Sequence, residues 1–147
     1  MIEIIGNRDE AEAINTTLAS WASALGNKDA AGVVRHLSDD VVSFTLAAPL
    51  VHKGKGEKGL EGWFSTWEGP IGGDAVDVRL TVGGDVAFWT GLVQMTGKKS
   101  DGFEVDLWFR QTLGLRKEAG VWTIVHEHTS VPFAMDGSGL AERGLKP

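Results

Sequence analysis

The side chains best suited to chemistry lie toward the C-terminal end of the chain, at Arg110, His126 and His128. The imidazole of histidine exchanges a proton near neutral pH, which makes it the most common general acid or base in proteins. A guanidinium can hold a carboxylate or an enolate oxygen through parallel hydrogen bonds. These residue types predict proton-transfer chemistry, with His128 or His126 as the proton carrier and Arg110 as the electrostatic partner.

The spacing of the two histidines leaves other interpretations open. Two imidazoles two residues apart on a strand can bind a metal, but a third ligand is required, and only Glu104 or Asp106 is a plausible source. We therefore expect no metal and no cofactor. The structural alternatives are a buried histidine that is hydrogen-bonded within the core and an ion pair between Arg110 and one of these carboxylates.

These side chains must be positioned by two strands, which we predict over residues 103–116 and 121–133. The intervening Glu118-Ala119-Gly120 predicts a three-residue loop closed by a glycine bulge, which pairs Arg110 with His128. A two-residue loop would shift this register by one residue and separate the pair.

Alternation along each strand decides which side chains face inward. Trp122 and Ile124 are large and apolar, so we expect their face, which carries both histidines, to line the interior. The strand side of the cavity is then predicted to consist of Trp108, Arg110, Thr112, His126, His128 and Ser130.

The remaining sequence predicts helices first and a long antiparallel meander afterwards, which is typical of α+β proteins. Apolar spacing of three and four residues predicts a helix over 8–25. The other expected elements are a second helix after Asp29, a strand over 41–46, a short helix over 60–67, and strands over 75–82 and 86–95. We expect a strongly curved antiparallel sheet wrapped around the helices, with Trp21, Trp63 and Trp67 closing a small-molecule pocket from the helical side.

This order of elements, together with residues 107–133 and the Asp39-Asp40-Val-Val segment, resembles the nuclear-transport-factor-like superfamily, in its SnoaL-like or ketosteroid-isomerase-like branch. The resemblance covers residues 8–133. It implies a cone-shaped, cystatin-like α+β barrel that serves isomerases, dehydratases, epoxide hydrolases and polyketide cyclases. The steroid isomerase mechanism is not expected, because the chain has no tyrosine and carries Thr45 or Leu46 where the resemblance would place the base.

Composition narrows the class of protein further. The 147 residues include 14 basic and 20 acidic side chains, a net charge of −6, which argues against nucleic acid and anionic membranes as partners. Cysteine is absent, which excludes disulfides and thiolate chemistry. The start of the chain lacks the features of a signal peptide, so we expect a cytoplasmic protein. We expect one domain over 1–147, with a core at about 8–133 and a loosely ordered tail over 134–147.

The opposite face of the strand over 103–116 is expected to mediate association. Its apolar side chains would point away from the cavity and present more apolar surface than a monomer normally leaves in water. We therefore predict a homodimer through the outer face of the sheet, built on Phe103, Val105, Leu107, Phe109, Leu113 and Leu115.

The sequence thus supports two functions. The first is a cofactor-independent isomerase, dehydratase or cyclase that acts on a small apolar or aromatic oxygenated substrate by histidine acid–base catalysis. The second is a non-catalytic ligand-binding protein or dimeric accessory domain.

Overall fold

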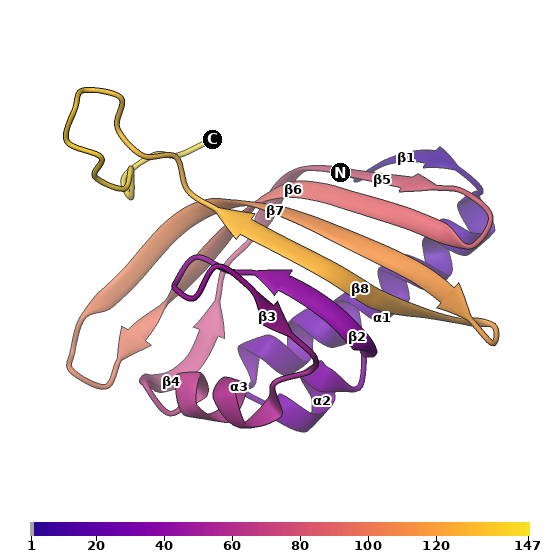
Figure 1. The fold of residues 1–147 in the computed structure, drawn as a ribbon, viewed down its shortest axis with the longest axis horizontal. Helices are drawn as coiled ribbons and strands as arrows, with labels where there is room; N and C mark the ends of the chain where they lie inside the picture. The colour runs from indigo at the N-terminus through magenta and orange to yellow at the C-terminus, as the bar shows by residue number, and fades with distance from the viewer. Residues whose placement is uncertain (1) are drawn as a thin grey trace.

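The fold comes from a computed structural model that describes residues 2–147 of the chain. Three helices pack against one curved sheet (Figure 1). The helices are α1 (Arg8–Gly26), α2 (Ala30–Val34) and α3 (Glu57–Phe64). The strands are β1 (Ile2–Gly6), β2 (Leu37–Phe44), β3 (His52–Lys53), β4 (Trp67–Gly72), β5 (Ala75–Val82), β6 (Val86–Lys99), β7 (Glu104–Glu118) and β8 (Val121–Ser130).

The sheet has the order β1-β5-β6-β7-β8-β2-β3, and β4 pairs with the far end of β6. Most neighbours are antiparallel, but β1 runs parallel to β5 and β2 runs parallel to β8. The α+β class and the curved sheet are confirmed, whereas the sheet is mixed and open rather than wholly antiparallel. The short strands β1, β3 and β4 were not expected from the sequence.

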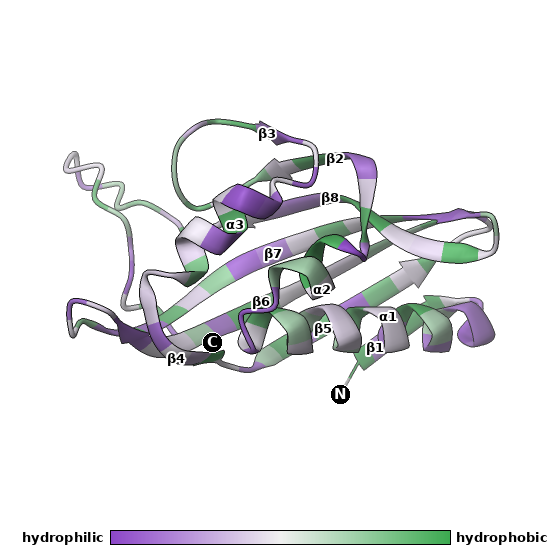
Figure 2. Ribbon diagram, turned by 90° about the horizontal axis from the view of Figure 1, so that it is seen from below, coloured by the Kyte–Doolittle hydropathy of each residue, from purple (hydrophilic) through white to green (hydrophobic). Residues whose placement is uncertain are grey.

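Helix α1 lies across the concave side of the sheet (Figure 2). Its buried side chains follow one helical stripe, because residues three and four apart share a face. They pack on the buried residues of β5 to β8 in a single core. The stripe consists of Ala11, Ile14, Leu18, Trp21 and Ala24.

The first turn of α1 is held to the end of the β7–β8 hairpin by Glu10. Its carboxylate accepts hydrogen bonds of 2.6 Å from Lys117 Nζ and from Trp122 Nε1. These hydrogen bonds, Lys117 first and Trp122 second, lower the pKa of Glu10. Helix α1 is therefore joined to the β7–β8 hairpin by a charged contact in addition to apolar packing.

The turn between β7 and β8 sets the register of the two strands that matter most for the site. Ala119 and Gly120 form a two-residue loop, with φ values of 49° and 79°, and Glu118 pairs with Val121. The expected three-residue loop is thus wrong.

A bulge then interrupts β8. Leu115 pairs with Ile124, but Gly114 pairs with His126, so Val125 is an extra residue in the ladder. A Cβ built on Gly114 would lie 3.4 Å from His126 Cβ and 3.8 Å from Val125 Cγ2. The absence of a side chain at Gly114 therefore leaves room for two consecutive β8 residues on the same face.

No helix within residues 2–147 is long and apolar enough to cross a membrane.

Candidate functional site

The bulge reverses the alternation of β8 midway along the strand. Ile124 is fully buried and faces inward, opposite the equally buried Leu115. Beyond Val125, Glu127 pairs with the buried Leu113, whereas His128 pairs with Thr112. Cross-strand partners point to the same face of a sheet. Glu127 therefore faces inward, and the histidines on either side of it face outward.

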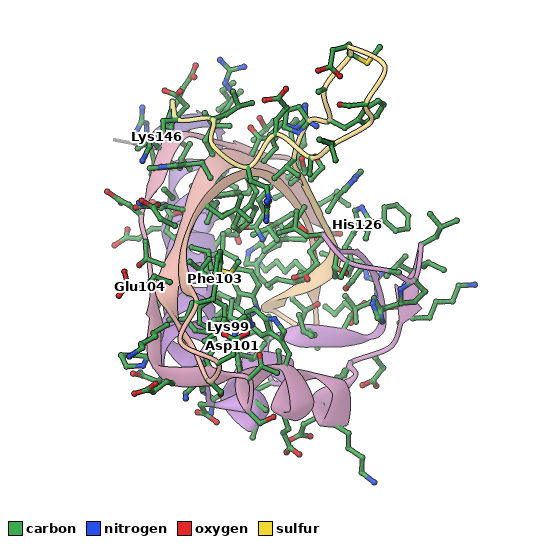
Figure 3. All side chains as sticks on the ribbon, turned by 90° about the vertical axis from the view of Figure 1, so that its left-hand side faces the viewer. Lys99, Asp101, Phe103, Glu104, His126 and Lys146 are labelled. Atoms are coloured by element: carbon green, nitrogen blue, oxygen red, sulfur yellow. The ribbon has the colours of Figure 1, made fainter. Side chains whose placement is uncertain are left out.

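The predicted catalytic group consequently lies on the wrong face for its expected role. Arg110 pairs with Ser130 rather than with His128, and both Arg110 and His128 are exposed. His126 projects from the side of β8 away from the enclosed space (Figure 3). The prediction that these side chains share a face is confirmed. The prediction that this face lines the cavity is wrong, because the bulge changes the alternation after Ile124.

The outward group makes contacts that need no ligand. Arg110 Nε donates to Ser130 Oγ at 3.1 Å, and His126 Nδ1 donates to the carbonyl oxygen of Val42 at 2.7 Å. Phe44 packs edge-on against the rings of His126 and His128, with centroid distances of 4.9 and 5.3 Å. Within residues 2–147 no three histidine, aspartate or glutamate side chains are grouped so as to hold a metal ion.

The other residues proposed from the sequence to bind substrate divide between the two faces. Trp21 and Trp63 line a cavity on the concave side. Trp67 is buried and packs against Trp63 with ring centroids 5.5 Å apart, but it lies behind the cavity lining. Trp108 and Thr112 lie on the outer face with Arg110, as their strand alternation requires.

The concave cavity has a volume of about 450 Å³. It lies between the C-terminal half of α1, the start of β5 and the inner faces of β6 and β7, and most of its wall is apolar. Volume and lining suit a small organic ligand with a mainly apolar body. The largest side chains in its wall are Trp21, Trp63, Trp89, Met95 and Phe109.

Trp21, one of the residues of this wall, carries a hydrogen-bond donor without a partner. The residue is 6% exposed, and its Nε1 atom is buried without a hydrogen-bond partner. A buried N–H without an acceptor costs free energy, and such groups in native proteins are rare.

Glu127 brings a carboxyl group to the same concave face. It pairs with Leu113, which lines the cavity, on one side and with Ser43 of β2 on the other. Burial raises the pKa of Glu127, because the charged form loses solvation. No ion pair within 4.0 Å joins Glu127 to a cation among residues 2–147. A carboxyl whose pKa is raised by burial and that lies beside a cavity is a candidate functional residue.

Sequence reasoning missed Glu127 because it treated the two neighbouring histidines as the inward residues. A signal was nevertheless present in β7. The odd-numbered positions of that strand carry an apolar series, which includes Phe109, Leu113 and Leu115, and these were assigned to a dimer interface. Phe109 and Leu113 instead line the cavity and Leu115 is fully buried, so the expected apolar outer face is also wrong.

A second hollow, of about 510 Å³, lies between β1 and α1 and is lined by Ile4, Arg8, Glu12, Asn15, Thr16 and Ala19. It is wide open to solvent, and its polar side chains make no converging group. We regard the concave cavity as the candidate site.

Comparison with known families identifies the chain. The family model of the SnoaL-like domain matches residues 14–134. The chain belongs to the SnoaL-like family. A search of curated proteins found no match to this SnoaL-like domain.

Solved structures resemble the SnoaL-like domain over most of its length. An NTF2-like protein of unknown function from Pseudomonas putida KT2440 is 28% identical, with a TM-score of 0.85, and the match covers 97% of this chain and 100% of that one. A ketosteroid isomerase-like protein from Erwinia carotovora atroseptica is 22% identical, with a TM-score of 0.69 and coverage of 84% and 97%. The association domain of CaMKII from C. elegans is 16% identical, with a TM-score of 0.68 and coverage of 84% and 96%. The latter two, at these identities, show the fold alone, so the chemistry must be argued from the site.

Proposed function

We propose that this SnoaL-like domain binds a small, mainly apolar carbonyl compound in its concave cavity and exchanges a proton with it through Glu127. The observation that carries the proposal is the inward carboxyl of Glu127, whose pKa is raised by burial, next to Leu113 of a mainly apolar, aromatic cavity. A raised pKa makes the carboxylate a stronger base, which favours removal of a proton from carbon.

Trp21 supplies the complementary group. When a carbon next to a carbonyl loses its proton, negative charge develops on the carbonyl oxygen. A fixed donor in a dry site stabilises that charge. In this chain, which has no tyrosine, the buried indole N–H of Trp21 serves as such a donor. The proton moves from the substrate carbon to Glu127 and returns to the same or a neighbouring carbon, so no oxidant or cofactor is needed.

Hydrogen–deuterium exchange tests this proposal even when the natural substrate and product are unidentified. The protein is incubated in D₂O with a panel of small ketones and enones that carry a phenyl or cycloalkyl group. Loss of the α-proton signal is followed by NMR. We expect exchange with at least one compound, slowed about 100-fold or more by Glu127→Gln. Trp21→Phe should weaken binding about tenfold, because one hydrogen bond to the oxygen is lost.

Glu104→Gln is the matched control, because Glu104 is an exposed carboxyl on the neighbouring strand β7. It should leave the exchange rate unchanged. Equal exchange in the wild-type protein, in Glu127→Gln and in buffer alone would refute the catalytic part of the proposal.

Ligand binding without catalysis is the second candidate. It is favoured by one observation: Glu127 lies next to Leu113 but is not itself part of the cavity lining. Under this alternative a panel compound binds, raises the melting temperature and retains its α-protons in D₂O.

A homodimer through the outer face remains a proposal, now with different support. The apolar series of β7 points inward, so the outer surface must rely on the scattered apolar side chains that it does expose, such as Phe44 and Phe88. The similarity of fold to an association domain is consistent with such pairing.

A further inference from the structure

Lys99 occupies the last position of β6, and its alternation places it on the same face as Met95 of the cavity wall. Its ammonium group lies 4.1 Å from the ring centroid of Trp67 and 5.6 Å from that of Trp63. Lys99 Nζ also donates to Thr66 Oγ1 at 2.8 Å. Figure 3 shows Lys99 close to Asp101 and Phe103 of the β6–β7 hairpin.

This cation lacks the acidic partner that several other lysines have. Among residues 2–147, Lys55, Lys98, Lys117 and Lys146 lie within 4.0 Å of a carboxylate, and Lys99 does not. Burial lowers the pKa of Lys99, although the charge of Asp101 acts in the opposite direction. Thr66 accepts one of the three N–H donors of this ammonium, so the group retains donors for an anion from outside.

A second unsatisfied donor lies in the same cluster. Trp67, whose ring packs under the ammonium, is 3% exposed, and its Nε1 atom is buried without a partner. Trp63 connects the cluster to the cavity, because it contacts both Lys99 and Trp67 and lines the cavity itself. The positive charge therefore stands at the edge of the apolar cavity.

We propose that Lys99 binds the carboxylate of the ligand whose apolar body fills the cavity, so that the ligand is an organic acid with an aromatic or aliphatic body. This inference rests on the proposed binding function of the cavity, not on the chemistry of Glu127. Lys99 follows Met95 of the cavity wall by four residues, ~13 Å along the backbone of β6. A probe that carries its carboxylate on a flexible chain can therefore place its ring in the cavity and still reach the ammonium beside Trp63. The local charge must overcome the net charge of −6, which by itself repels anions.

Two probes that differ only in charge test the inference: 6-phenylhexanoate and 6-phenylhexan-1-ol, titrated by calorimetry at pH 7. For the wild-type protein we expect the acid to bind about tenfold more tightly than the alcohol. Lys99→Gln should abolish this preference and leave the affinity for the alcohol unchanged. The retained affinity for the alcohol also shows that the variant is folded.

Lys98→Gln is the matched control. Lys98 is adjacent in sequence, points to the opposite face and lies 3.9 Å from Glu68. It should retain the preference for the acid. Equal affinity of the wild-type protein for the two probes, or an undiminished preference in Lys99→Gln, overturns the inference. Failure of both probes to bind refutes the cavity-binding proposal and this inference with it. If the acid binds but no ketone or enone of the D₂O panel exchanges its α-proton, only the catalytic role of Glu127 is refuted.

Discussion

The two halves of β8 alternate in opposite ways between buried and exposed side chains, although both belong to one strand. In the half next to the hairpin, the even-numbered Trp122 and Ile124 are buried. In the half beyond Val125, the odd-numbered Glu127 faces inward and the even-numbered His128 is exposed. A single extra residue in the ladder produces the reversal, since side chains alternate with a period of two.

The difference teaches that the identity of a site can depend on one local irregularity of the backbone. The hairpin half of β8 is a structural element, fixed by apolar packing against Leu115 and by the contact of Trp122 with Glu10. The far half presents a carboxyl to the concave side and imidazoles to the convex side. Without the bulge, the histidines would face the concave side and Glu127 the convex side.

The largest effect is expected in the hairpin half. Ile124→Ala removes a fully buried side chain from the core and should lower the free energy of unfolding by ~2–5 kcal/mol. Ser130→Ala, on the outer face of the far half, should change it by less than ~0.5 kcal/mol. Urea unfolding of both variants measures the contrast. Similar losses in the two variants would show that the halves do not differ in structural role.

A smaller and pH-dependent effect is expected at Glu127. The unfolded chain loses the Glu127 proton near the ordinary carboxyl pKa of 4.5. The folded protein, in which burial raises this pKa, keeps the proton to higher pH. Stability contributed by this group is therefore lost as pH rises toward the folded-state pKa. Glu127→Gln should raise the melting temperature at pH 8 and have little effect at pH 4, as thermal scans would show. A difference of the same size at both pH values would indicate that the carboxyl is not desolvated.

The smallest effect is expected at His128. Its side chain is exposed on the outer face, so His128→Ala should change the free energy of unfolding by less than ~0.5 kcal/mol. The rate of α-proton exchange should also stay unchanged. Abolition of exchange with normal stability would instead restore the histidine mechanism predicted from the sequence and contradict the assignment of Glu127.

Much of the fold could be read from local patterns. The stripe from Ala11 to Ala24 predicted α1, and the alternating strands after residue 75 predicted the meander. The edge strand β1 was missed, because five residues carry too little periodicity to distinguish a strand from a loop. Trp67 was assigned to the end of α3 and instead begins β4, although it keeps its contact with Trp63.

The candidate site was predicted only in part, for a physical reason. Trp21 and Trp63 were correctly placed on the cavity, since the face of an amphipathic helix follows from spacing within one element. Arg110, Thr112, His126, His128 and Ser130 were correctly placed on one face but on the wrong side. Their position depends on how two strands pair, and a turn of two residues plus a bulge of one cannot be read from either strand alone.

By itself the sequence determined the class of fold, the helical wall of the cavity, the lack of thiol and tyrosine chemistry, and the presence of an apolar stripe on β7. These properties depend on composition and on periodicity within single elements. Only the tertiary structure decided that this stripe faces inward, that Glu127 rather than the histidines shares its face, and that Lys99 lies beside Trp63 without a carboxylate within 4.0 Å. Such placements arise from register and from contacts between distant segments, which are set by packing of the whole sheet rather than by any one segment.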